Sequence, residues 1–102
     1  MTEALNPEDK KLYMQEYKHA ADLFERAAKE AQKSDNPYQK EAFKQVMDRA
    51  MHVLEETAGE LAKPNLLKHN QKIAEDFEAY KKDAPQSFDQ LVRDLEKAKK
   101  SV

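Results

Sequence analysis

The sequence predicts an all-α protein, a three- or four-helix bundle made of a long antiparallel helical hairpin and one or two C-terminal helices. One glycine and four prolines among 102 residues leave long stretches of good helix formers. Apolar residues in these stretches recur at spacings of three and four, the period of a helix face, and prolines stand between the stretches. Because chains of this length seldom divide, we expect a single helical domain over residues 1–102.

The first helix is expected near residues 7–33. Asn6 can accept hydrogen bonds from the free amides of its first turn, and Pro7 suits the first helical position. One stripe of this helix is apolar and must be covered by another helix. The stripe comprises Tyr13, Tyr17, Ala20, Phe24, Ala27 and Ala31, and Leu23 and Ala28 widen it.

Charged side chains of the first helix are expected to pair along its exposed face. Asp22 with Arg26, and Glu25 with Lys29, stand four residues apart in the favourable order, and each pair contributes about 0.3 kcal/mol. Lys97, Lys99 and Lys100, near the other end of the chain, suit the negative end of a helix dipole.

The second helix is expected near residues 37–62, after a tight turn. Asp35 or Asn36 can cap it, and Pro37 fits its first turn. Gly59 permits either a close helix crossing or a fraying last turn, and we favour the fraying turn. The apolar stripe comprises Phe43, Met47, Ala50, Leu54, Thr57 and Leu61, and Val46, Val53 and Ala58 broaden it.

The third helix is expected near residues 65–83, because Pro64 separates it from the second. Asn70 interrupts its apolar stripe. A polar residue at such a position can fix the register of packed helices, but near a helix end we expect it to be solvated. The stripe comprises Leu66, Asn70, Ile73, Phe77, Tyr80 and Ala84.

A short fourth helix is expected near residues 87–100. Pro85 breaks the preceding run, and Ser87 with Gln90 forms a capping-box pattern. Whether the third and fourth helices form one bent rod stays open. The apolar stripe of the fourth comprises Phe88, Leu91, Leu95 and Ala98.

Composition excludes several classes of function. The 18 basic and 20 acidic residues are interspersed, so no broad positive field would attract nucleic acid. No run approaches the ~18 apolar residues of a membrane span, and the start of the chain lacks an apolar signal core. The absence of cysteine excludes disulfides and thiol chemistry and fits a reducing compartment, so we expect a cytoplasmic protein.

Catalytic and cofactor sites are not expected. Glu16 and His19 have the Glu-x-x-His spacing of di-iron bundles, but Glu16 lies on the flank of the apolar stripe and His19 outside it. No second copy of the motif exists to complete a metal site. A single glycine rules out a glycine-rich nucleotide loop, and no small-molecule ligand is evident. We therefore expect no metal, no cofactor and no enzymatic activity.

His52 offers an alternative function. The segment His52-Val53-Leu54, on the solvent side of the second helix, resembles the phosphoacceptor motif of histidine phosphotransfer domains. The resemblance covers about three residues and implies a helical signalling module that is phosphorylated on His52 by a receiver aspartate. That family continues with a lysine and a small residue, whereas Glu55 and Glu56 follow here. The other interpretation is an ordinary surface histidine.

The leading hypothesis is a non-catalytic module for protein–protein interaction, an adaptor, chaperone-like or structural subunit. Long helices with wide apolar stripes are expected to leave surface that one short chain does not cover, so a protein partner or self-association would complete its burial. The candidate partner-binding residues lie on the second helix, although for the methionines we favour filling of the core. These residues are Phe43, Met47, Met51 and Leu54.

Overall fold

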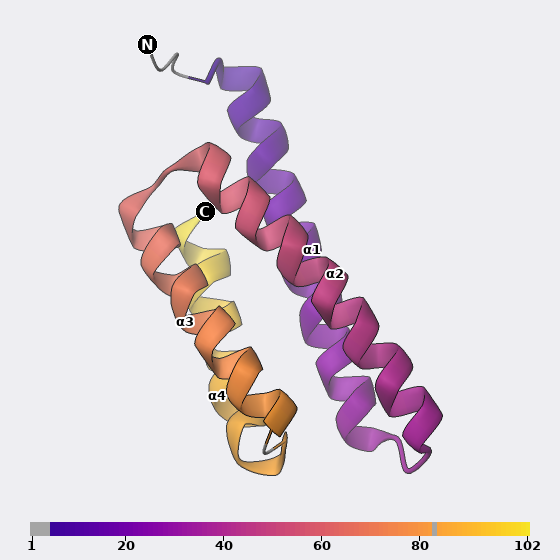
Figure 1. Ribbon diagram of the computed structural model, residues 1–102. Helices are drawn as coiled ribbons and strands as arrows, with labels where there is room; N and C mark the ends of the chain where they lie inside the picture. The colour runs from indigo at the N-terminus through magenta and orange to yellow at the C-terminus, as the bar shows by residue number, and fades with distance from the viewer. Residues whose placement is uncertain (1–4, 83) are drawn as a thin grey trace.

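A computed structural model describes residues 5–82 and 84–102 and confirms the all-α fold class. The described residues form four helices: α1 (Pro7–Lys33), α2 (Pro37–Leu61), α3 (Pro64–Lys82) and α4 (Ala84–Ser101). Figure 1 shows them as two hairpins, α1 with α2 and α3 with α4, lying side by side. The third and fourth helices are thus two separate antiparallel rods, and the arrangement extends over 48 × 22 × 19 Å.

The order of the helices around the bundle follows from which pairs approach. Within each hairpin the two helices are in extensive contact, and between the hairpins α1 approaches α4 and α2 approaches α3. Among the described residues, the backbones of the diagonal pairs, α1 with α3 and α2 with α4, do not come close. Short connections make consecutive helices antiparallel, so the bundle runs up, down, up and down.

The size of the buried side chains explains why α1 and α2 lie so close together. Five alanines of α1 are buried, and α2 buries two more. Small residues at a helix contact allow the two backbones to approach, whereas large ones hold them apart. The buried alanines are Ala20, Ala21, Ala27, Ala28 and Ala31 in α1, and Ala50 and Ala58 in α2.

Large side chains fill the space between the two hairpins and connect α1 with α3 across the core. Phe24 meets Phe77 edge-on, with ring centroids 5.0 Å apart. The buried hydroxyl of Tyr17 donates a hydrogen bond of 2.8 Å to Oδ1 of Asn70. Burial raises the pKa of Tyr17, which keeps this hydroxyl protonated and able to donate. Asn70 is only 7% exposed, so our expectation of a solvated side chain was wrong.

The helix starts agree with the sequence at the two N-terminal caps and differ at α4. The side chain of Asn6 accepts from the amide of Asp9 at 2.8 Å, and that of Asn36 accepts from the amide of Tyr38 at 2.9 Å. The helix α4 begins at Ala84, three residues before the expected start, so Ser87 lies inside the helix and does not cap it. Pro85 falls in the first turn of α4, where a missing amide hydrogen costs nothing.

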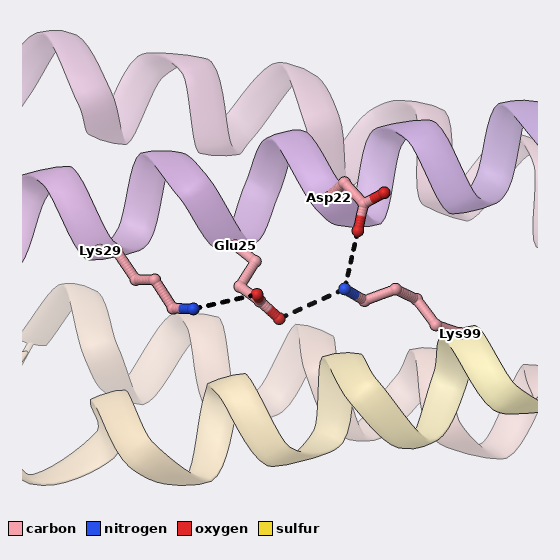
Figure 2. A network of polar contacts seen from close by, with 4 residues as sticks. All are labelled: Asp22, Glu25, Lys29 and Lys99. Atoms are coloured by element: carbon pink, nitrogen blue, oxygen red, sulfur yellow. Dashed lines mark hydrogen bonds and ion pairs between the residues drawn. The ribbon is translucent and has the colours of Figure 1, made fainter.

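An ion-pair network ties α4 to α1, and it replaces one of the expected pairs (Figure 2). Nζ of Lys99 lies 2.8 Å from a carboxylate oxygen of Asp22 and 3.4 Å from one of Glu25. Glu25 also pairs with Lys29 at 3.2 Å, as the sequence predicted. Asp22, however, binds Lys99 and leaves Arg26 without that partner. Burial lowers the pKa of Lys99, but the two carboxylates outweigh burial and leave this pKa raised.

At the C-terminal end of α2, two residues are of types that do not suit the local backbone conformation. Gly59 lies inside the helix, and nothing would lie within 4 Å of an added Cβ, so no close crossing explains this glycine. Ala62 caps the helix with φ of 50°, in the left-handed region that favours glycine. The helix therefore continues past its one glycine to Leu61 and is capped by an alanine.

Two single substitutions, alanine at position 59 and glycine at position 62, should each stabilise the protein. We expect Gly59→Ala to raise the free energy of unfolding by about 0.5–1 kcal/mol, because alanine loses less backbone entropy in a helix. Ala62→Gly should raise it by about 1 kcal/mol, because glycine adopts a positive φ without strain. Urea unfolding followed by circular dichroism measures both changes. Ala79→Gly, on the exposed face of α3, is the control and should destabilise; an equal loss at position 62 would contradict the prediction.

Candidate interaction surface

Most of the candidate partner-binding residues lie in the core of the chain itself. Met47 and Leu54 are fully buried and Met51 is 7% exposed, whereas Phe43 is half-buried at the edge of the core. The methionines therefore fill space between α2 and the other hairpin, which was the interpretation that we favoured for them. Of the four candidates, only Phe43 offers surface to another molecule.

An apolar groove runs between α1 and α2 on the side turned away from α3 and α4. It consists of two stretches with volumes of about 190 and 220 Å³ that meet at Leu23. Every described residue that lines it belongs to α1 or α2. We call this surface the α1–α2 groove. Its apolar lining comprises Ala20, Leu23 and Ala27 from α1, and Phe43, Val46, Ala50 and Val53 from α2.

Two large side chains in the groove are well exposed to water. Leu23 is 40% exposed and Val53 38%, and Val46 beside them is half-buried. In the sequence these residues only widened the apolar stripes. Each stands on the flank of its stripe, so helix pairing within the hairpin covers it incompletely. An apolar surface of this kind, rimmed by polar residues, is typical of a binding site.

The rim of the α1–α2 groove carries charges of both signs. Arg26 and Glu30 flank one stretch, and Glu16, His19 and Arg49 flank the other. Among the described residues, none of these side chains makes a salt bridge. The acidic and basic groups are thus available to charges on another molecule.

His52 lies on the opposite side of α2, in a groove of about 440 Å³ against α3. Its exposed imidazole shares this groove with three carboxylates and with Lys81. Lys81 is already engaged, since its Nζ lies 2.9 Å from Glu78, 3.7 Å from Asp48 and 4.6 Å from the centroid of the Phe77 ring. The hydrogen bond with Glu78 and the charge of Glu78 raise the pKa of Lys81. Partial burial lowers this pKa, but the net shift is upward.

The surroundings of His52 are more acidic than the sequence indicated. Glu55 follows on the same helix face, and Asp48 and Glu78 add two further carboxylates to the lining. Together these carboxylates would repel a phosphoryl group. The cation nearby, Lys81, is already paired with carboxylates. Glu16 and His19, the other spaced pair noted in the sequence, are both exposed on the rim of the α1–α2 groove.

A pair of buried carboxyl groups joins α3 to α4, and the sequence did not indicate it. Asp76 is 8% exposed and Asp94 3%. Gln90 donates to both oxygens of Asp94 at 3.2 and 3.3 Å, whereas Oδ2 of Asp76 accepts no hydrogen bond from the described residues. Burial, followed by a hydrogen bond with Asp94 and the charge of Asp94, raises the pKa of Asp76 to about 7.

Because the pKa of Asp76 is about 7, its carboxyl group carries a proton at mildly acidic pH and is partly protonated at neutral pH. Glu75 adds a smaller upward effect on the pKa of Asp76, and Lys72, 3.9 Å away, opposes it. A protonated Asp76 can donate to the carboxylate of Asp94, which satisfies the otherwise unpaired oxygen. Each aspartate looks like an ordinary helix-surface residue in the sequence, so only the packing of α3 on α4 reveals the pair.

Among residues 5–82 and 84–102, no three His, Cys, Asp or Glu side chains cluster closely enough to hold a metal ion. None of the helices in this part of the chain contains an apolar stretch that could cross a membrane. Comparison of the chain with protein-family models, curated proteins and solved structures finds no match. The groove and its charges are therefore the basis for a functional proposal.

The Asp76 carboxyl should make stability depend on pH. An unfolded aspartate titrates near pH 4, so between about pH 4 and 7 the folded chain binds the extra proton, and stability falls as pH rises through this window. We expect a loss of about 2 kcal/mol between pH 5 and 8 that Asp76→Asn abolishes, because its amide still donates to Asp94 without a charge. Urea midpoints at four pH values measure the slope. The control, Asp89→Asn on the exposed side of α4, should keep the wild-type slope, and parallel curves for wild type and Asp76→Asn would refute the assignment.

Proposed function

We propose that this chain is a non-catalytic helical module that binds another protein chain through the α1–α2 groove, as an adaptor, chaperone-like or structural subunit. The observation that carries the proposal is the groove itself. It exposes Leu23 and Val53 beside side chains of both charges that find no partner among the described residues. Because the large core side chains lie between the two hairpins, the α1–α2 groove can contact a partner while the fold stays intact.

The shape of the groove favours an α-helix as the bound element. Two antiparallel helices leave a straight, apolar furrow between them, into which helices of another chain can place residues spaced by three and four. The polar rim would then meet charged residues on the flanks of those helices. Large, centrally placed apolar residues dominate the affinity of such contacts, so Leu23 and Val53 are the expected energetic centre.

A non-catalytic role is supported by the separation of the reactive side chains. His19 lies on the rim of the α1–α2 groove, His52 lies on the other side of α2, and His69 belongs to α3. Catalysis needs such groups to converge on one substrate. The cytoplasm is the proposed location, because a chain without cysteine suits a reducing compartment.

A second candidate function is phosphotransfer through His52. The observation in its favour is the position of the imidazole, exposed in a groove that a receiver domain could approach, with Lys81 on the opposite wall. The carboxylates in that groove weigh against it, so we rank it below protein binding.

Site-specific photocrosslinking in cells tests the main proposal. A photoreactive amino acid in place of Leu23 should yield one adduct of defined mass, because the bound chain covers that position. The matched control is Leu67 of α3, which is 43% exposed, close to the 40% of Leu23, but lies outside the α1–α2 groove. No adduct at position 23, or the same adducts at both positions, would count against the groove as the binding site.

A small phosphodonor tests the second candidate. Incubation with acetyl phosphate should label the wild-type protein with an acid-labile phosphate, and His52→Gln should remove the label. His19→Gln, which changes another exposed imidazole, should leave the label intact. Failure to label the wild-type protein eliminates phosphotransfer and leaves the protein-binding proposal untouched.

A further inference from the structure

We propose that the occupant of the α1–α2 groove is the same groove of a second copy of this chain, turned antiparallel about a two-fold axis. This inference rests on the proposed function and names its partner. A two-fold contact requires a surface that is complementary to itself, which is a demanding condition. The order of the charges along α1 and α2 meets it.

On α2, one flank carries an arginine, an apolar residue and a glutamate in succession. Arg49, Val53 and Glu56 are spaced by four and three, so they share one side of the helix. In an antiparallel pair centred on Val53, Arg49 of each copy lies opposite Glu56 of the other. The apolar centre is then flanked by two symmetric ion pairs.

On α1, the same elements occur in the reverse order. Glu16 precedes Leu23 and Arg26, with His19 between them, along the rim of the groove. Because α2 runs antiparallel to α1, Glu16 and Glu56 lie toward one end of the face and Arg26 and Arg49 toward the other, where Glu30 stands beyond Arg26. In an antiparallel dimer, the acidic end of each copy therefore lies opposite the basic end of the other.

One axis serves both helices. The midpoint of Glu16 and Arg26 falls one residue beyond Ala20, and Ala20 and Val53 line the same stretch of the groove. The centres of the two charge patterns thus lie in the same stretch of the groove. Arginine side chains are long and flexible enough to absorb a small offset between them.

The dimensions of the face predict a reversible dimer. The groove from Glu16 to Glu30 spans about 21 Å of α1, and two adjacent helices are about 20 Å wide, which gives a footprint of about 400 Å² per copy. Stable interfaces bury about 800 Å² per partner, so the contact falls at the weak end of the range. Dilution should separate the copies.

Sedimentation equilibrium over a concentration series, from about 5 to about 500 µM, measures the association. We expect wild type to move from monomer to dimer across this range. Arg49→Glu and Glu56→Arg should each weaken self-association about tenfold, because each places like charges opposite one another twice. An equimolar mixture of the two variants should dimerise again, since every pair across the contact is then of opposite sign.

Matched controls separate the contact from general effects on the fold. Arg93→Glu reverses an exposed arginine of α4 and should leave association unchanged, as should Leu67→Ser, whereas Leu23→Ser should abolish dimerisation. Circular dichroism checks that each variant remains helical. A wild-type monomer at all concentrations overturns the inference, and so does a mixture that associates no better than its components. The protein-binding proposal would survive either result if the Leu23 adduct contains a different protein.

Discussion

The packing of the two hairpins depends on side chains that reach across the core from α1 to α3. The backbones of these helices stay apart, yet Phe24 meets Phe77 and Tyr17 binds Asn70. The aromatic contact supplies buried area but tolerates sliding. The hydrogen bond does not, because a shift of one residue would leave two buried polar groups without partners, at a cost of several kcal/mol. The polar pair thus fixes the register that the apolar residues leave adjustable.

The same division of the core leaves one face of the bundle open. Large residues of α1 and α2 point toward α3 and α4, and the alanines are used to bring α1 and α2 together. The flanking residues Leu23, Val46 and Val53 therefore face the α1–α2 groove, where no described residue of α3 or α4 covers them. The proposed binding surface is therefore a consequence of how the chain forms its core.

Local features of the fold could be predicted from the sequence, and those that depend on distant residues could not. Asn6 and Asn36 cap their helices because cap and amide lie within three residues of each other. Tyr17 and Asn70 are 53 residues apart, and Asp22 and Lys99 are 77 residues apart. Nothing in the local pattern distinguishes these side chains from solvated ones. The wide stripes indicated that apolar surface would stay open, but three of the four candidate residues on α2, namely Met47, Met51 and Leu54, are buried in the core.

The network around Lys99 has a consequence for the order in which the protein matures on the ribosome. The α1–α2 hairpin is synthesised first and can form from its own contacts, with Tyr17 and Phe24 still facing water. Asp22 and Glu25 remain without Lys99 until the last turns of α4 have emerged. The ion pairs between α1 and Lys99 therefore form only when α4 packs and the whole bundle is complete. Until that moment the nascent chain exposes two apolar faces, and it is most vulnerable to aggregation and to capture by chaperones.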